Sequence, residues 1–328
     1  MSADVVRGDC VDPNEKTIVR EYAEAWRESL VHRPTTEAHV ETNLRRHVYP
    51  TFGDRRMSSV LPSGVQARVS RLSRTLSPST VHVIHGILAG IYKCAMRDRI
   101  VHRSPCEGTR LPRKLPREVM PLATSTVESL IGAAPARYRA AVVLAAGTGV
   151  RQGECFGVAQ DRLDLDRQLL RVDQQVILLA RRPPMLAPPK TSASHRTIPL
   201  PKVVCEVLRR HLEQFPVQHP EGLIFTDEEG QALRRTRFSR EIWRPTVAAA
   251  GAPRGTGFHD LRHYYASLLI RHGESIKTVQ RRLGHATAAE TLDTYAHLWP
   301  DSDDRTREAI DSVLEASPAD AESLPRDE

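Results

Sequence analysis

The chain has 328 residues, of which 40% are hydrophobic and 27% charged, a composition typical of a globular protein with room for two domains. No stretch approaches the roughly 18 apolar residues of a membrane span, and the first ten residues lack the apolar core of a secretory signal. The five cysteines are scattered without C-x-x-C spacing, which argues against a disulfide framework or a cysteine zinc site. We therefore expect a cytoplasmic protein with reduced cysteines and no membrane association.

The net charge of +7 is unevenly distributed along the chain. Residues 301–328 contain ten acidic and three basic side chains, a balance of −7, so the preceding 300 residues carry 44 basic and 30 acidic side chains, or +14. A basic body followed by an acidic tail favours a polyanionic partner such as nucleic acid, although solubility alone is a simpler alternative.

Residues 17–108 are predicted to form a bundle of four helices, after a flexible segment over residues 1–16. Helices are expected over residues 17–31, from Pro34 to about Arg46, from Pro62 onward and from Pro78 onward. The first has apolar residues at helical spacing at Ile18, Tyr22, Ala25, Trp26 and Leu30, and the fourth at Val81, Ile84, Leu88, Ile91 and Ala95.

Basic residues are frequent in this bundle, and as a group they could follow a phosphate backbone. They are Arg45, Arg46, His47, Arg55, Arg56, Arg68, Arg71, Arg74, Lys93, Arg97 and Arg99. The alternative for each of them is an ordinary solvated surface position.

An extended basic linker is predicted for residues 109–121, which contain three prolines and four basic residues. A second domain over residues 122–300 begins with a helix near Thr124. Strands of a small sheet are predicted over residues 168–179 and 195–200, with helices dominating after Val203. The proline-rich residues 183–189 are interpreted as a loop between strands in preference to a polyproline ligand.

Short segments in this second domain carry side chains suited to phosphate chemistry. Arg151 follows a Gly-Thr-Gly turn, and its guanidinium fork matches two phosphate oxygens, while Glu154 lies within reach to orient it. Lys190 follows two prolines and is expected at or near the tip of a β-hairpin. His259 and Arg262 lie three residues apart and share a helix face, which provides a second arginine for the same phosphate.

The remaining candidates are His285, at a turn after a helix over residues 276–283, and Tyr295, ten residues further on. Taken alone, each could be structural: a turn histidine and a core tyrosine. A rival interpretation makes His259 and His263 a metal-binding pair, but the glutamate of an H-E-x-x-H motif is missing.

In this order, the six residues Arg151, Lys190, His259, Arg262, His285 and Tyr295 resemble the catalytic set of the tyrosine recombinase (phage integrase) family, and Glu154 matches its acidic accessory. The resemblance extends from about Val19 to Pro300. It implies a mainly α fold with a small β-sheet, comprising an N-terminal four-helix core-binding domain and an α+β catalytic domain. An additional N-terminal domain for arm-type DNA sites, present in many phage integrases, is not expected in the few residues before the first helix.

By this resemblance, Tyr295 attacks a scissile phosphate to give a 3′-phosphotyrosine, Lys190 protonates the leaving 5′ oxygen, and the other four residues stabilise charge. No metal or other cofactor is implied. The implied partners are double-stranded DNA attachment sites, a homo-tetramer on two duplexes, and possible accessory DNA-bending or directionality proteins. Alternatives are a host-type dimer-resolving recombinase, a type IB topoisomerase, a DNA-binding protein without catalysis, or a metal-dependent nuclease.

The acidic tail over residues 301–328 is predicted to contain a short helix over residues 305–316, with Ile310, Val313 and Leu314 on one face. A helix this short is marginal in isolation, so its apolar stripe needs a surface to cover. Related recombinases dock this segment on a neighbouring protomer, and the same trans docking is expected here. The alternatives are a helix folded back on its own domain, or a disordered acidic end beyond Ser317.

Overall fold

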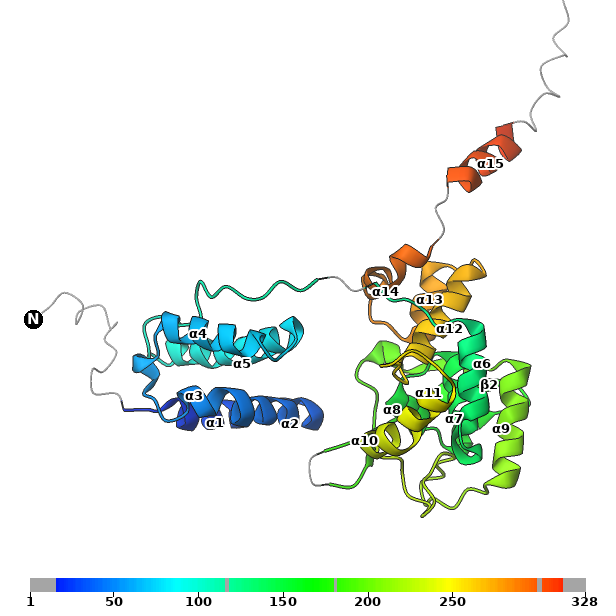
Figure 1. The fold of residues 1–328 in the computed structure, drawn as a ribbon, viewed down its shortest axis with the longest axis horizontal. Helices are drawn as coiled ribbons and strands as arrows, with labels where there is room; N and C mark the ends of the chain where they lie inside the picture. The colour runs from blue at the N-terminus through cyan, green and yellow to red at the C-terminus, as the bar shows by residue number, and fades with distance from the viewer. Residues whose placement is uncertain (1–15, 116–117, 180–181, 300–302, 315–328) are drawn as a thin grey trace, which may run out of the picture. The chain divides into compact units, whose positions relative to one another are not determined.

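The computed structural model describes residues 16–115, 118–179, 182–299 and 303–314, so almost all of the segment predicted to be flexible, 1–16, and the chain beyond Leu314 lie outside it. The chain divides into two compact units, residues 1–117 with 177–183 and residues 118–176 with 184–328 (Figure 1). The predicted mainly α fold with a small sheet is confirmed. Within the described ranges, no helix is long and apolar enough to cross a membrane.

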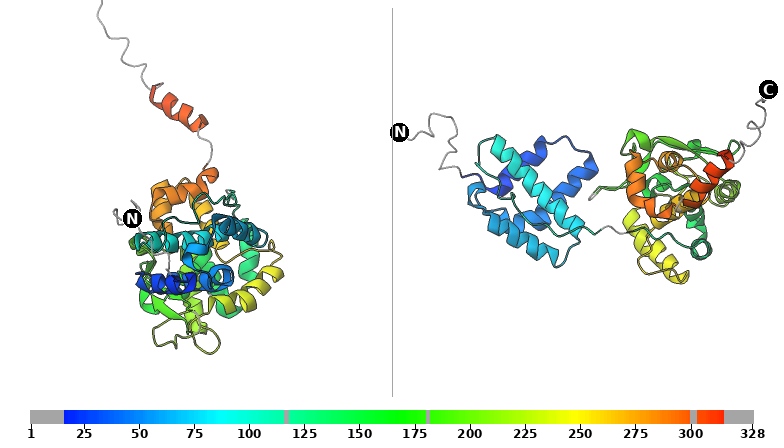
Figure 2. Two further views of the ribbon diagram at one scale, coloured as in Figure 1. Left: turned by 90° about the vertical axis from the view of Figure 1, so that its left-hand side faces the viewer. Right: turned by 90° about the horizontal axis from the view of Figure 1, so that it is seen from above.

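Unit 1 is built from helices. They are α1 (Val19–Ser29), α2 (Pro34–Asn43), a π-turn (Leu44–Val48) leading into α3 (Tyr49–Phe52), a 3-10 turn (Met57–Ser59), α4 (Pro62–Ser73) and α5 (Pro78–Arg97). Helices α2, α4 and α5 begin at prolines. Proline suits the first helical turn because the backbone N–H groups of that turn have no acceptor within the helix, so the N–H that proline lacks is not needed there. Helices α4 and α5 lie side by side and α5 also packs on α1 (Figures 1 and 2), so that the apolar face predicted for α5 is buried.

Two details of unit 1 differ from the prediction. The second helix does not end near Arg46, because the π-turn lets Tyr49 donate its N–H to the Leu44 carbonyl and carries the helix past Pro50 to Phe52. In α1 the fully buried residues are Val19 and Ala23, whereas Ala25 is exposed. The buried stripe of α1 is therefore rotated from the predicted one.

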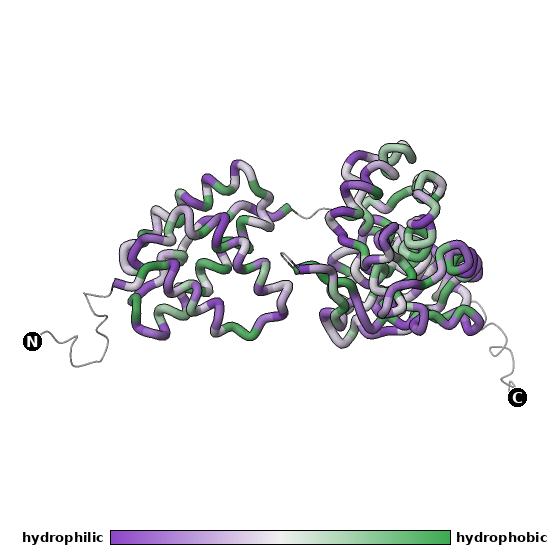
Figure 3. Tube along the Cα trace, turned by 90° about the horizontal axis from the view of Figure 1, so that it is seen from below, coloured by the Kyte–Doolittle hydropathy of each residue, from purple (hydrophilic) through white to green (hydrophobic). Residues whose placement is uncertain are grey.

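Unit 2 surrounds a helix with small side chains that is buried along nearly its whole length, α7 (Ala136–Thr148). The other helices are α6 (Thr124–Ala133), α8 (Gln152–Phe156), α9 (Lys202–Gln214), α10 (Arg235–Phe238), a π-turn (Ser239–Trp243), α11 (Arg244–Ala249), α12 (Asp260–Arg271), α13 (Ile276–Leu283), α14 (Ala288–Tyr295), a 3-10 turn (Ala296–Leu298) and α15 (Asp303–Leu314). Figure 3 shows hydrophobic and hydrophilic residues interspersed along the chain of both units, as expected where most helices bury one face.

The strands of unit 2 form two small sheets. Strands β1 (Leu163–Asp164), β2 (Leu169–Val172) and β5 (Arg196–Pro199) are antiparallel in the order β1-β2-β5, and β3 (Gln175–Ile177) pairs with β4 (Met185–Ala187). The strand predicted over 168–179 is thus two strands in different sheets. The prediction of a loop over 183–189 is wrong. The three residues between the two proline pairs, Met185–Ala187, have backbone N–H groups and form β4.

The segment predicted as an extended linker is held at both ends. The Gln66 side chain bonds both backbone groups of Arg110, at 2.8 and 3.1 Å, and His82 Nε2 lies 2.9 Å from the carbonyl oxygen of Pro112. At the other end, His297 Nε2 donates to the Val119 carbonyl at 2.9 Å. Side chains outside the predicted linker therefore anchor Arg110 and Pro112 near its start and Val119 near its end.

Candidate active site

The turn between α7 and α8 positions Arg151. Gly149 ends α7 in the left-handed conformation at φ +65°, and a Cβ at this position would lie 2.4 Å from Cδ1 of Tyr265. Glycine therefore allows both the turn and the close approach of α12. Arg151 follows as the N-cap residue of α8, with its side chain about one-third exposed.

Glu154 is the buried centre of an ion-pair network. Its Oε1 accepts from Arg151 Nη1 at 3.0 Å, and its Oε2 accepts from the Arg151 backbone N–H at 2.9 Å. Arg196 of β5 donates to the same carboxylate at 2.9 and 3.3 Å. Burial raises the pKa of Glu154, but the charges of Arg196 and Arg151 outweigh it and the net pKa is lowered. The carboxylate thus stays ionised and orients Arg151.

The first turn of α12 supplies the second predicted arginine. His259 is the exposed N-cap residue of this helix, whereas Arg262 is 2% exposed. Arg262 donates from Nη1 to the Gly149 carbonyl and from Nη2 to the Leu283 carbonyl, each at 2.7 Å. Two of its five N–H donors are therefore used to tie α12 to the ends of α7 and α13.

Both arginines bind the C-terminal end of α13. Arg262 takes the Leu283 carbonyl, and Arg151 Nη2 donates to the next carbonyl, that of Gly284, at 3.2 Å. Such terminal carbonyls lack helical partners and carry the negative end of the helix dipole, so guanidinium groups are favourable there. The two bonds fix the turn that carries His285.

His285 and Tyr295 face each other across this turn. The His285 ring is buried, its Nδ1 lies 2.8 Å from the Thr291 hydroxyl, and it stacks on the Tyr295 ring at a centroid distance of 6.4 Å. Tyr295 is the last residue of α14, is 1% exposed, and places its hydroxyl 2.8 Å from Nδ1 of His263.

The site is positively charged around neutral histidines. Arg151, Arg196 and Arg262 against Glu154 leave a net charge of +2. Burial, and then the charges of Arg262 and Arg151, lowers the pKa of His285 to about 3. Partial burial also lowers the pKa of His259, and the charges of His263 and Arg262 lower it further. Because His259 is exposed, solvent screens these charges. Burial raises the pKa of Tyr295 to about 12, although the charges of Arg262 and Arg151 act to lower it. An anion bound here would act in the opposite direction and raise the pKa of both histidines.

Within the described part of the chain, Lys190 is the one predicted site residue that no contact ties to this cluster. It is exposed and lies in a bend three residues beyond the end of β4. The predicted hairpin-tip position is therefore wrong: the β3–β4 hairpin turns before Met185, and Lys190 belongs to the segment leading to the 3-10 turn Ser192–Ser194. Among the described residues, Ser194 of that turn links the segment to the site through a 3.4 Å bond from Arg151.

Four residues of the site were missed in the sequence. Arg196 pairs with Glu154, Thr291 bonds His285, His263 bonds Tyr295, and His297 binds the carbonyl of Val119. His263 had one signal, its i, i+4 spacing from His259, which stacks the two rings edge to face at 4.8 Å. Trp299 packs on the apolar cluster around Tyr295.

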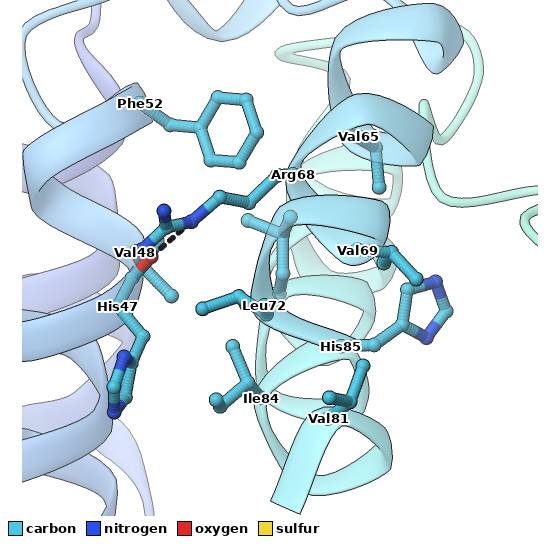
Figure 4. A pocket seen from close by; sticks show the side chains of 11 residues that line it. His47, Val48, Phe52, Val65, Arg68, Val69, Leu72, Val81, Ile84 and His85 are labelled. Carbon is cyan, nitrogen blue, oxygen red and sulfur yellow. Dashed lines mark hydrogen bonds between the residues drawn. The ribbon is translucent and has the colours of Figure 1, made fainter. Parts of the chain in front are cut away.

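The basic residues of unit 1 differ in whether their side chains are free to contact a phosphate. Arg68 is half-buried, and its Nε and Nη2 donate to the His47 carbonyl at 3.1 and 2.9 Å, in the π-turn beside a small apolar cavity (Figure 4). Arg45 pairs with Glu41 at 2.8 Å. Arg68 therefore stabilises the bundle, whereas Arg46, Arg71 and Arg74 are exposed.

Comparisons with known proteins place this geometry in a family. The chain is 27% identical to the putative prophage phiRv2 integrase of Mycobacterium tuberculosis (strain ATCC 25618 / H37Rv) over 84% of this chain and 73% of that protein. It is 28% identical to the ICEBs1 integrase of Bacillus subtilis (strain 168), over 73% and 67%. Its fold matches the Tn1549 transposon integrase in complex with a circular intermediate DNA, with a TM-score of 0.76, 20% identity, and coverage of 90% of this chain and 99% of that one. The family model described as "Phage integrase family" matches residues 115–301, more than half of the chain, which therefore belongs to the phage integrase family of tyrosine recombinases, enzymes that break and rejoin DNA.

Proposed function

We propose that this chain carries out site-specific strand exchange with Tyr295 as the nucleophile and without a metal. The observation that supports it best is the position of the Tyr295 hydroxyl, which bonds His263 beside the stacked His285 in the field of Arg151 and Arg262. The test is to trap the protein on a nicked duplex and map the covalently modified peptide. An adduct on any other residue would refute the assignment.

In the proposed reaction, Arg151 and Arg262 neutralise the non-bridging phosphate oxygens, and His259 and His285 donate hydrogen bonds to the same group. The net charge of +2 suits a phosphodiester whose negative charge is redistributed in the transition state. Because Tyr295 is 1% exposed, the hydroxyl meets the phosphate only after the residues that cover it move.

Lys190 is proposed to protonate the departing 5′ oxygen, since an exposed lysine on an irregular segment can reach a bound strand. Lys190→Ala should therefore cleave slowly, by about 10²-fold or more, on an ordinary substrate. A 5′-bridging phosphorothiolate should restore the rate, because a thiolate leaves without a proton. Single-turnover cleavage of the two substrates provides the measurement, with Lys202→Ala as control. If sulfur gives no rescue, another group is the acid, and His259 is the next candidate.

Double-stranded DNA attachment sites are the proposed substrate, within a mobile element that is integrated or excised. The residues up to 300 carry a charge of +14, the relatives named above are the phiRv2 prophage integrase and the ICEBs1 integrase, and the matching fold is that of a transposon integrase. Two pairs of strand exchanges imply four protomers on two duplexes. Accessory bending or directionality proteins would act on that assembly.

The tail is proposed to dock on a neighbouring protomer. Helix α15 covers most of the predicted segment and leaves Ile310 and Leu314 55% and 69% exposed, whereas the side chain of Val313 lies outside the described positions. Truncation after residue 300 should preserve binding of one protomer to a half-site but weaken cooperative assembly and recombination. Ile310→Ser with Leu314→Ser should reproduce the effect, and Asp311→Ser should not. Unchanged cooperativity in a gel-shift titration would contradict trans docking.

A further inference from the structure

We propose that His263 is a catalytic residue that accepts the phenolic proton of Tyr295 during attack on the phosphate. This inference depends on the proposed role of Tyr295 as the nucleophile. It starts from a single contact, the 2.8 Å distance between His263 Nδ1 and the Tyr295 hydroxyl.

The direction of this hydrogen bond follows from burial. Tyr295 is 1% exposed, and within the described part of the chain its hydroxyl has no hydrogen-bond partner besides His263. If Nδ1 carried the proton, the phenolic hydrogen would be buried without an acceptor, which is costly. The hydroxyl therefore donates to an unprotonated Nδ1, and the imidazole carries its proton on Nε2.

The groups around the pair keep both partners neutral before reaction. Burial lowers the pKa of His263, Arg262 lowers it further, and Asp260 opposes them. Around the same contact, the His259 ring meets the His263 ring edge to face and the His285 ring stacks on that of Tyr295. Glu290 opposes Arg262 and Arg151 in their effect on the pKa of Tyr295. A neutral imidazole next to a phenol that keeps its proton is the starting state that a general base requires.

Helix α12 also places the proposed proton acceptor, His263, beside the proposed phosphate ligands. His263 follows Arg262 directly and lies one turn beyond His259, so that the His259, His263 and Tyr295 rings form a row with centroid distances of 4.8 and 5.6 Å. The proposed phosphate ligands and the proton acceptor thus come from one turn of α12. The hydrogen bonds from Arg262 to two carbonyls hold that turn rigidly.

The step balances without any further reactant. As an electron pair of the Tyr295 oxygen forms the O–P bond, the phenolic proton passes to the Nδ1 lone pair of His263, giving an imidazolium. The P–O5′ bond breaks, its electron pair leaves with the 5′ oxygen, and Lys190 supplies the proton for that hydroxyl. In rejoining, Lys190 takes the proton back from the attacking 5′ hydroxyl, and His263 returns its proton to the departing Tyr295 oxygen.

Two substitutions separate a base from a merely positioning residue. His263→Asn keeps an acceptor near the Nδ1 position but cannot take a proton, whereas His263→Ala removes both. We expect both variants to form the covalent complex at least about 10²-fold more slowly on a nicked suicide duplex. Half-site affinity should be retained. The matched control is His272→Gln, an exposed histidine at the end of the same helix, which should cleave like the wild type.

The pH profile gives a readout that a structural role would not change. In the wild type, cleavage should fall as the pH drops through the pKa of His263, which burial holds below its ordinary value, because the protonated imidazole cannot accept a proton. In His263→Asn this decline should vanish, and the rate should instead rise with pH toward the high pKa of Tyr295. This profile can be measured on the unmodified enzyme, so folding of the variants does not limit it.

Distinct results would overturn the inference. Near wild-type cleavage by His263→Asn would leave His263 with positioning alone, and a wild-type rate with no acidic decline would exclude a titrating base. Failure of the proposed function looks different, because Tyr295→Phe would then still form the adduct. If Tyr295→Phe is inactive while His263→Asn is active, only the inference about His263 fails.

Discussion

Replacing Tyr295 with phenylalanine is expected to abolish the covalent protein–DNA complex completely while leaving DNA binding intact. The ring packs with Tyr265, Ile270 and Leu283, and phenylalanine preserves that packing. The lost bond to His263 costs about 1 kcal/mol, which does not unfold a domain with an extensive core. Only the attacking oxygen is missing. Adduct formation on a nicked suicide duplex, followed on a denaturing gel, and gel shifts of the same duplex provide the two measurements.

Tyr265→Phe is the control for this result. Tyr265 is buried in the same cluster and also lies beside the α7–α8 turn, through its close approach to Gly149. Its variant should form the adduct as the wild type does. If Tyr295→Phe yields a denaturant-stable adduct, another nucleophile attacks the DNA and the assignment of the site must change.

The helices that carry the candidate residues could be predicted because their signals are local. Helix α13 begins and ends where predicted, since Ser275 caps its first turn and Gly284 takes the left-handed conformation at φ +65°. Gly149 does the same for α7. Glycine and capping residues at fixed offsets specify turns without tertiary contacts, and both turns lead directly into site residues.

Long-range pairings could not be predicted in this way. Glu154 meets Arg196 across 42 positions and Tyr295 meets His263 across 32, and nothing in either local pattern selects those partners. The two π-turns were also missed, because an X-Pro step normally indicates the end of a helix. In each π-turn a backbone N–H bonds the carbonyl five residues earlier, so the helix continues past the proline. Whether this pairing forms depends on tertiary packing.

The positions of basic residues in the sequence also do not show which of them can reach a phosphate. Arg68 lies close in sequence to Arg71 and Arg74, which are exposed, but its guanidinium binds the His47 carbonyl inside unit 1. Position on the buried face of α4, between Val65 and Val69, makes this difference. A basic cluster in sequence therefore overstates the charge that can reach a phosphate.

Arg151→Lys and Arg262→Lys are each expected to slow cleavage by roughly two to four orders of magnitude, with a much smaller effect on site binding. Lysine keeps the charge but loses the planar fork. At position 151 it cannot at once bind Glu154, the Gly284 carbonyl and a phosphate oxygen, as the guanidinium can. Single-turnover cleavage rates and half-site dissociation constants measure the two effects separately.

The two variants should differ in stability, and this difference separates chemistry from folding. Arg262 is 2% exposed and joins the ends of α7 and α13 through two 2.7 Å bonds, so Arg262→Lys loses one of them and should lower the melting temperature. Arg151 is more exposed, and Arg151→Lys should melt close to the wild type while cleaving as poorly. Arg210→Lys, a change at an exposed position of α9, serves as the control for both measurements. Equal losses of binding and cleavage in Arg151→Lys would make this residue an ordinary phosphate contact, because a transition-state ligand must affect the rate more than the affinity.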